Sequence, residues 1–359
     1  MSHIRIFVVD DSVVFRKLLL TTINSIPGVR TVGVAENGKE ALEAIPLVKP
    51  DLITLDLNMP VMDGLETLRQ LREVYPQFRV IMVSAYTSDG AVATLKAFEA
   101  GALDVITKPD TDDPALNSKL LHDQFVGLFT KYADSQRDVD VAPRVVSIKQ
   151  SYTVAKETSC SLHLSNIVKP EVVAIGLSTG GPNALAELLP SLPASFSLPV
   201  LIVQHMPRLF TRTLAESLGR KAAIKVVEAQ DDTELKAGTV YIAPGGTQMK
   251  VRRGANGKVF VQITDAPAEN YCKPSADYLF RSVAQVYGDK ALGVIMTGMG
   301  SDGELGLKLM KRQGAQIIAQ DRQTCTVWGM PRAATEAGVV DIVLPLNEIA
   351  AEIIRSGHN

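Results

Sequence analysis

The first 130 residues alternate between short apolar runs and amphipathic stretches. The apolar runs lie at 4–9, 30–35, 51–56, 79–85 and 103–107, and helix-type patterns follow them at 12–26, 38–47, 64–74, 89–100 and 115–130. Continuous apolar runs are typical of strands buried on both faces, and a period of about 3.6 residues indicates a helix. Five such β/α units predict a parallel five-stranded sheet with helices on both faces.

This alternation stops between 131 and 169 and restarts after Pro170. The intervening segment alternates between polar and β-branched residues and has no helical pattern, which predicts a flexible linker. Further strands are predicted near 171–177, 199–204, 224–227, 291–297, 315–319 and 340–343, with a short-stranded β insert near 239–263. We therefore expect an α/β domain at 1–130, a linker at 131–169 and a second, doubly wound, Rossmann-like α/β domain at 170–359.

Composition narrows the class of protein. The chain has 359 residues, 46% of them hydrophobic and 21% charged, which is typical of globular domains. No apolar run reaches the roughly 18–20 residues that a membrane-spanning helix needs, so we expect a soluble, cytoplasmic protein without direct membrane insertion. Three widely spaced cysteines exclude a disulfide framework and a cysteine-rich zinc site.

Charge is distributed unevenly. The net charge of −2 argues against a general affinity for nucleic acid. Residues 1–130 hold 12 basic and 17 acidic residues, whereas 131–169 hold 6 and 4, and 170–359 hold 19 and 18. The acidic excess therefore belongs to the first domain.

Polar side chains follow the strands of the first domain. Asp10 and Asp11 end the first strand, Asp56 the third, Ser84 the fourth and Lys108 the fifth. A single Asp at a strand end is most often a helix cap. Clustered carboxylates, however, predict a hard divalent cation such as Mg²⁺, and a carboxylate beside Mg²⁺, a lysine and a hydroxyl can accept a phosphoryl group.

Four motifs, VVDDS at 8–12, LDLNMPVMDG at 55–64, VSA at 83–85 and TKP at 107–109, resemble the flavodoxin-like receiver domain of two-component response regulators. The resemblance implies a phosphate accepted from a sensor histidine kinase onto Asp56. It also implies Asp10, Asp11 and Asp56 around Mg²⁺, with Ser84 and Lys108 on the phosphoryl oxygens. Receivers usually have Tyr or Phe on the fifth strand where this chain has Val105. The aromatic side chain whose rotamer acts as a switch in that family is therefore missing here.

The second domain opens on a strand that leads into Gly176-x-Ser178-x-Gly180. This pattern is typical of a sharp turn that exposes a nucleophilic serine, although such turns also bind phosphates or cap helices. His205 directly follows the next predicted strand and could act as the base. Asp302 follows a later strand and could orient the imidazole. The three side chains together predict a Ser/His/Asp hydrolase.

A competing prediction comes from the segment that contains Asp302. Gly298, Gly300 and Gly303 follow a strand and open a helix, with Asp321 about twenty residues later, which matches a dinucleotide-binding fingerprint. The motif comes late in the domain and leaves Ser178 and His205 unexplained. A dinucleotide-binding α/β enzyme is therefore the second hypothesis.

The segments IGLSTGGP, IVQHMP, APGG, KPSAD, GVIMTGMGSDG, AQD and WGMPRAA resemble the protein-glutamate methylesterase catalytic domain. With a receiver in front, the architecture is similar to the CheB family of chemotaxis response regulators. The resemblance implies Ser178 as nucleophile, His205 as general base and Asp302 as its orienting carboxylate. Backbone amides near Thr179 and Met299 are the candidates for oxyanion stabilisation. The family often has histidine where this chain has Gln248.

The reaction implied by this resemblance is hydrolysis of glutamate γ-methyl esters and deamidation of glutamine. Its substrates are the cytoplasmic domains of methyl-accepting chemoreceptors, and the esterase step needs no cofactor. In the resembled family the unphosphorylated receiver covers the esterase site. A phospho-dependent docking protein with an inactive esterase fold is the remaining alternative.

Overall fold

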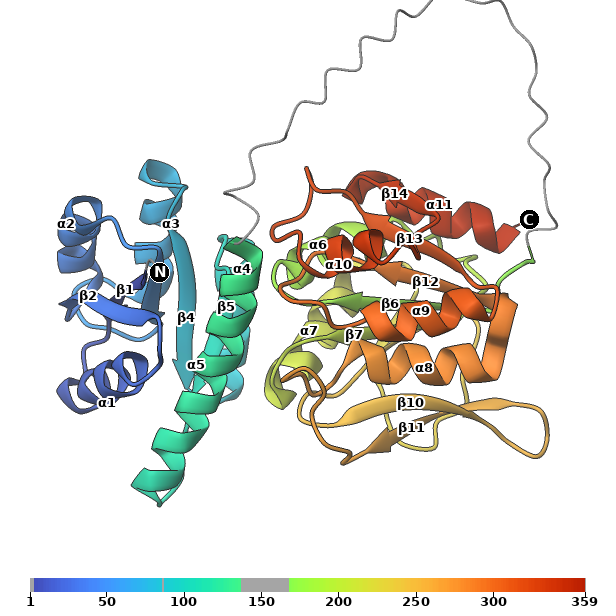
Figure 1. Cartoon of the computed structure of the whole chain (residues 1–359), viewed down its shortest axis with the longest axis horizontal. Coiled ribbons are helices and arrows are strands. Elements are labelled where there is room, and N and C mark those ends of the chain that lie inside the picture. Colours follow the sequence, from blue (N-terminus) through green and yellow to red (C-terminus); the bar gives the residue numbers. More distant parts are fainter. Residues whose placement is uncertain (1–2, 86, 137–167, 359) are drawn as a thin grey trace, which may run out of the picture.

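Two parallel sheets organise the chain, each built from apolar strands that are buried on both faces (Figure 1). The computed structural model describes residues 3–85, 87–136 and 168–358. Within these residues no helix is long and apolar enough to cross a membrane.

The first domain is a five-stranded parallel sheet in the order β2-β1-β3-β4-β5. Its elements are β1 (Ile4–Val9), α1 (Val13–Asn24), β2 (Val29–Ala35), α2 (Gly38–Val48), β3 (Leu52–Asp56), α3 (Gly64–Val74), β4 (Arg79–Ala85), α4 (Ser88–Glu99), β5 (Asp104–Lys108) and α5 (Pro114–Gln136). Helices α1 and α5 cover one face, and α2, α3 and α4 cover the other. β5 is an edge strand.

Side-chain caps explain where the first four helices begin. The oxygens of Ser12, Asn37, Asp63 and Thr87 each accept a hydrogen bond from a backbone N–H three residues later. Such a cap satisfies one of the free N–H groups of the first turn and stabilises a helix by about 1 kcal/mol. The strand-to-helix turns that carry the site residues are therefore fixed locally.

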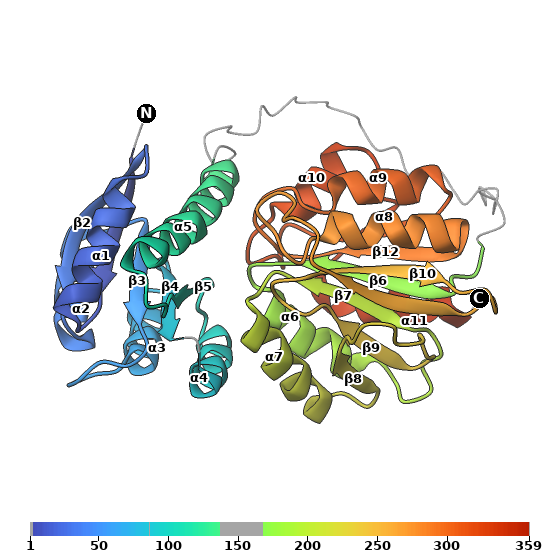
Figure 2. The same ribbon diagram turned by 90° about the horizontal axis from the view of Figure 1, so that it is seen from below.

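The second domain is a seven-stranded parallel sheet in the order β14-β13-β12-β6-β7-β9-β8, with a separate antiparallel pair, β10-β11. Its strands are β6 (Val172–Leu177), β7 (Val200–Gln204), β8 (Lys225–Glu228), β9 (Thr239–Ile242), β10 (Gln248–Arg253), β11 (Val259–Thr264), β12 (Ala291–Ile295), β13 (Gln316–Gln320) and β14 (Ile342–Leu344). Its helices are α6 (Gly181–Leu188), α7 (Arg208–Lys221), α8 (Ala276–Tyr287), α9 (Glu304–Arg312), α10 (Met330–Glu336) and α11 (Leu346–His358), with short 3₁₀ turns at Leu189–Ser191 and Gly288–Lys290. Figure 2 shows α6 and α7 on one side of this sheet and α8 and α9 on the other.

The predicted fold class is confirmed, with one correction to the insert. Residues 239–242 were expected to belong to it, but β9 pairs in parallel with both β7 and β8 inside the main sheet. Its four residues are all buried, which is typical of a central strand. The insert is thus the β10-β11 hairpin. Helix α5 continues to Gln136, and residues 137–167 of the predicted linker lie outside the described residues.

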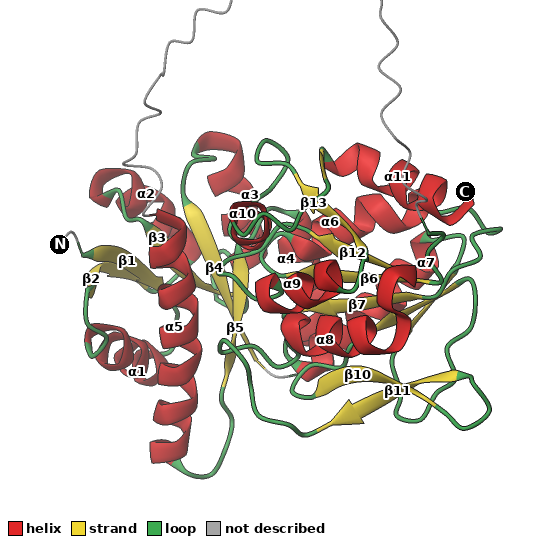
Figure 3. Cartoon of the chain, turned by 45° about the vertical axis from the view of Figure 1, so that its right-hand side comes forward, coloured by secondary structure: helices red, strands yellow, loops and turns green. Residues whose placement is uncertain are grey.

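The two domains are in direct contact through α4, which lies against α6 and α7 (Figure 2). Figure 3 shows both sheets, with β5 of the first sheet on the side of the second domain. Asn183 Nδ2 donates to the carbonyl of Phe98 at 2.7 Å, and Lys221 Nζ lies 2.9 Å from Glu99 Oε1. Buried side chains of both domains form one continuous hydrophobic cluster that includes Phe98 and Phe210. The edge of the receiver sheet therefore faces the second domain.

We expect Gly64→Ala to destabilise the first domain by about 1–3 kcal/mol, the usual cost of forcing extra volume into a packed site. A Cβ at Gly64 would lie 2.0 Å from the carbonyl oxygen of Asp56, which cannot move away. Trp328, the single tryptophan, lies in the second domain, so its fluorescence reports that domain while circular dichroism reports both.

The measurement is urea unfolding followed by both signals. Gly127→Ala is the control, because its new Cβ would lie 3.5 Å from Tyr271 Cβ, an ordinary van der Waals contact. Equal stability of Gly64→Ala and the wild type by circular dichroism would contradict the expectation.

Candidate functional site

The first candidate site lies at the carboxyl edge of the receiver sheet. Strands β1 and β3 are neighbours, so Asp10 and Asp56 meet there, and both are buried. Lys108 Nζ lies 2.8 Å from Asp10 Oδ2 and 2.9 Å from Asp56 Oδ2. Asp11 is exposed, and carboxylate oxygens of Asp10, Asp11 and Asp56 lie within 4.8 Å of one another. These three oxygen donors suit a hard cation such as Mg²⁺.

Burial and the lysine act in opposite directions on this site. Burial raises the pKa of Asp56, and the nearby Lys108 ammonium partly offsets that rise. Burial would lower the pKa of Lys108, but Asp56 and Asp10 outweigh it and raise the pKa. Lys108 thus stays charged between two carboxylates. Ser84 is buried at the end of β4, and its hydroxyl donates long hydrogen bonds to the carbonyls of Ala85 and Gly90, at 3.3 and 3.4 Å.

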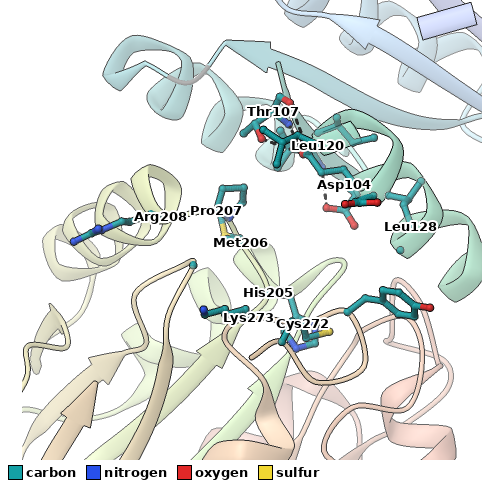
Figure 4. A pocket seen from close by; sticks show the side chains of 18 of the residues that line it. Asp104, Thr107, Leu120, Leu128, His205, Met206, Pro207, Arg208, Cys272 and Lys273 are labelled. Atoms are coloured by element: carbon teal, nitrogen blue, oxygen red, sulfur yellow. Dashed lines mark hydrogen bonds between the residues drawn. The ribbon is translucent and has the colours of Figure 1, made fainter. Parts of the chain in front are cut away.

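The second candidate site lies at the carboxyl edge of the larger sheet. Leu177 pairs with Gln204 on the adjacent parallel strand, so Ser178 and His205 leave the sheet side by side. The His205 amide donates to the Leu177 carbonyl at 3.2 Å, which fixes this register. Both residues line one cavity of about 960 Å³. Figure 4 shows His205 at the floor of that cavity.

Asp302 is held by four donors. His205 Nε2 donates to its Oδ2 at 2.8 Å, and the Ser275 hydroxyl donates to Oδ1 at 2.7 Å. The amides of Ala276 and Asp277, in the first turn of α8, donate to the same carboxylate at 2.6 and 3.2 Å. Burial alone would raise the pKa of Asp302, but these hydrogen bonds lower it to about 2. Asp302 is therefore an ionised acceptor that fixes the imidazole tautomer.

Backbone contacts hold Ser178 in a tight turn. Its amide donates to the Thr297 carbonyl at 3.0 Å, and its carbonyl accepts from Gly181 N and Gln204 Nε2. Gly180 has a φ of 80° and lies so close to Thr326 that a side chain at Gly180 would clash. The glycine at this position is therefore required by both the backbone angle and the space.

Met299 lines the same cavity, and Thr179 directly follows the lining residue Ser178. Both are buried, and within the described residues neither backbone amide has a hydrogen-bond acceptor. Buried N–H groups without acceptors are rare, so these two are available to an oxygen of a bound substrate. The Thr179 hydroxyl donates to Asp104 Oδ2 of the receiver domain at 3.3 Å.

The glycines of the competing dinucleotide hypothesis have other neighbours. A Cβ at Gly298 would lie 2.3 Å from Met330 Sδ and 2.9 Å from Ser178 Cβ. The Gly298 carbonyl accepts from the amides of Gly329 and Met330. The backbone at Gly298 is therefore packed closely against the protein's own side chains, Met330 and Ser178. The turn that follows it places Asp302 next to His205.

Sequence reasoning missed several residues around this site, including Ser275, Asp277 and Cys272. Cys272 Sγ lies 3.5 Å from His205 Nδ1. Gln248 is fully buried; its Oε1 accepts from the Ser275 amide and its Nε2 donates to the carbonyls of Pro267 and Cys272. The KPSAD segment was the available signal, because it places a capping serine and a carboxylate at the start of a helix.

Comparisons with known proteins match both domains. Residues 173–353 match the family model of the CheB methylesterase, and residues 6–119 match that of the response regulator receiver domain. A curated relative from Desulfotalea psychrophila, named protein-glutamate methylesterase/protein-glutamine glutaminase, is 44% identical over 363 residues and 99% of each chain. One of the same name from Trichodesmium erythraeum is 44% identical over 359 residues, again 99% of each chain.

A solved structure is similar to the second domain. The CheB methylesterase catalytic domain of Thermotoga maritima is 41% identical in sequence, with a TM-score of 0.51. The match covers 52% of this chain and 99% of that one. The fold of the second domain is therefore shared with a methylesterase catalytic domain.

We expect Asp277→Asn to reduce the pH dependence of stability. Burial raises the pKa of Asp277 to about 6, with a further rise from the Asp302 carboxylate. The folded state binds this proton more tightly than the unfolded chain. The stability that this bound proton contributes is fully present below the unfolded pKa of 3.8. It is lost as the pH rises through 6. The loss is on the order of 3 kcal/mol, and the Asp277→Asn variant does not show it.

The measurement is urea unfolding at pH 4, 5, 6 and 7, followed by Trp328 fluorescence. Asp289→Asn, at an exposed position in the same domain, is the control. Identical slopes of unfolding free energy against pH in Asp277→Asn and the wild type would contradict the assignment.

Proposed function

The chain belongs to the CheB methylesterase family, and from this premise we propose that it hydrolyses glutamate γ-methyl esters and deamidates glutamines on chemoreceptor cytoplasmic domains. Residues 1–130 act as the receiver, 131–169 as the linker and 170–359 as the catalytic domain. Both the substrate and the phosphodonor, a sensor histidine kinase, place its action in the cytoplasm, in chemotactic adaptation.

The observation that carries this proposal is the pairing of His205 with Asp302 at 2.8 Å beside the strand end that presents Ser178. Nε2 of the imidazole is committed to an ionised carboxylate, so the lone pair lies on Nδ1. An imidazole fixed in this tautomer is the base that a serine nucleophile needs.

The reaction proceeds through an acyl-enzyme. Ser178 Oγ attacks the γ-carboxyl carbon while His205 Nδ1 takes the hydroxyl proton, and the amides of Thr179 and Met299 bind the oxyanion. His205 then returns the proton to the leaving methoxide, and methanol departs. Water, deprotonated by His205, hydrolyses the acyl-enzyme to free glutamate. With a primary amide as substrate, ammonia leaves in place of methanol.

The receiver site fits Mg²⁺, which Asp10, Asp11 and Asp56 would hold. The ion supplies positive charge that offsets the carboxylates and the incoming phosphoryl group. The resemblance to receiver domains assigns Asp56 as the acceptor, and this buried carboxylate is bonded to Lys108. Lys108 and the weakly bonded Ser84 hydroxyl bind phosphoryl oxygens.

Regulation acts through the contact between the domains. Asp104 of β5 accepts a hydrogen bond from Thr179, the residue next to the nucleophile, and receiver residues form one wall of the active-site cavity. Lys108, at the other end of β5, bonds to the acceptor Asp56. Phosphorylation activates the esterase only if the phosphate is bound more tightly in the arrangement that separates the domains.

We expect Ser178→Ala to reduce methanol release from methylated receptor membranes by about 10³-fold or more, because the acyl-enzyme cannot form. Phosphorylation of Asp56 by a small-molecule phosphodonor with Mg²⁺ should be unchanged. Ser191→Ala, at an exposed position in the same domain, is the matched control. Methanol release at the wild-type rate from Ser178→Ala would refute the mechanism. A wild type that binds receptor but releases no methanol would favour the docking protein.

We expect Asp104→Ala to raise the methylesterase rate of the unphosphorylated protein several-fold. Loss of one charge-assisted hydrogen bond removes about 1–2 kcal/mol from the closed arrangement. The measurement is methanol release without a phosphodonor, and Asp112→Ala, an exposed residue outside the cavity, is the control. An unphosphorylated rate equal to that of the wild type would show that the Asp104 contact does not hold the receiver in place.

A further inference from the structure

The active-site cavity has walls of opposite charge. The receiver wall contains three carboxylates, Asp104, Asp110 and Asp123, and one cation, Lys108. The catalytic wall contains two cations, Arg208 and Lys273, and no acidic residue among the described residues that line it. Figure 4 shows Arg208, Lys273 and His205 on the catalytic side, opposite Asp104.

The receiver wall is more acidic than this count suggests. Lys108 Nζ is bonded to Asp10 and Asp56, so its charge is already neutralised. Asp110 and Asp123 are exposed, and the imidazole of His122, on the same helix, lies 3.6 Å from Asp123. The receiver thus presents excess negative charge to the catalytic wall.

Arg208 is an unusual residue for its position. It is the first residue of α7, whose first turn has no acidic side chain, and it is exposed. A cation at a helix N-terminus opposes the helix dipole and is unfavourable by some tenths of a kcal/mol. Within the described residues no carboxylate lies in ion-pair distance of it. Arg208 lies at the rim of the cavity, and Figure 4 shows its guanidinium directed outward from it, where an approaching partner can reach it.

Lys273 forms an ion pair with a solvent-exposed carboxylate. Its Nζ donates to Asp265 Oδ1 at 2.7 Å and to the Asp265 carbonyl at 3.3 Å, and the Asp265 side chain is 93% exposed. Exposed ion pairs of this kind contribute little, so another carboxylate can replace Asp265 at small cost. Lys273 directly follows Cys272, the neighbour of His205, and its carbonyl accepts from the Gly246 amide, which ties two cavity loops together.

We propose that Arg208 and Lys273 bind acidic residues that flank the modified glutamate on a helical substrate, and that the acidic receiver wall occupies the same place before phosphorylation. The proposal rests on the proposed function. Each turnover leaves a free carboxylate, and glutamates three or four residues apart lie about 5–6 Å apart on one helix face. A helix with neighbouring free glutamates can therefore present carboxylates to the two cations, and the receiver wall presents Asp104, Asp110 and Asp123 to the same cavity.

The experiment uses the full chain, phosphorylated with a small-molecule phosphodonor and Mg²⁺. Two receptor cytoplasmic fragments are methylated at one site, one with glutamates and one with glutamines at the neighbouring positions. The variants are Arg208→Glu, Lys273→Glu and the milder Arg208→Gln. Arg220→Glu, on the same helix about 18 Å away and outside the cavity, is the matched control.

With the acidic fragment, each reversal should raise KM about tenfold and change kcat less than twofold, and 0.5 M salt should reduce the difference. With the glutamine fragment, KM should change less than twofold, which also shows that the variants are folded. Equal losses on both fragments, or an equal loss in Arg220→Glu, would overturn the proposal.

Binding separates this test from the proposed function. In a Ser178→Ala background, calorimetric titration with the acidic fragment needs no catalysis. Weaker binding in Arg208→Glu and Lys273→Glu, but not in Arg220→Glu, supports the recognition site even if methanol release fails. Unchanged binding in all three refutes it whatever the esterase activity.

Discussion

A carboxylate buried at the edge of a parallel sheet is unstable unless hydrogen-bond donors surround it, and Asp302 imposes this constraint on the catalytic domain. Its four donors come from β7 and from the cap and first turn of α8, which are distant in sequence. Removing any of them leaves a buried charge undersatisfied, which costs more than an ordinary hydrogen bond contributes. Gln248 is needed for the same reason, since it holds Ser275 and the Cys272 loop in position.

The positions of the main site residues were predictable because they depend on local patterns. An apolar run followed by a polar residue marks the carboxyl end of a strand, and this placed Asp10, Asp56, Ser178 and His205 correctly at their sheet edges. The contacts of Ser275 and Gln248 were not predictable, since they join segments whose pairing no periodicity encodes. The assignment of β9 to the insert was wrong for a related reason, because a strand of four residues does not indicate which strands it pairs with.

The two domains contribute to one cavity although each has its own sheet and its own site. Apolar contacts of α4 with α6 and α7 bring the domains together, whereas the polar contacts at the cavity, such as Asp104 with Thr179, are few. Apolar area then supplies most of the adhesion, and the polar groups supply the alignment. A modest change in charge at the receiver can therefore alter the alignment without having to disrupt either fold.

β5 connects the phosphoryl-acceptor site to the catalytic domain in five residues, from Asp104 to Lys108. The two side chains are four positions apart, about 13 Å along an extended strand, and an even spacing keeps them on the same face. Valine at position 105, where receivers usually have an aromatic residue, therefore leaves the strand uninterrupted. The length of this strand is a stricter constraint than its composition. Substitutions at the three residues between the ends preserve the geometry, whereas inserting or deleting one residue would turn Asp104 away from Thr179 and uncouple the two halves of the molecule.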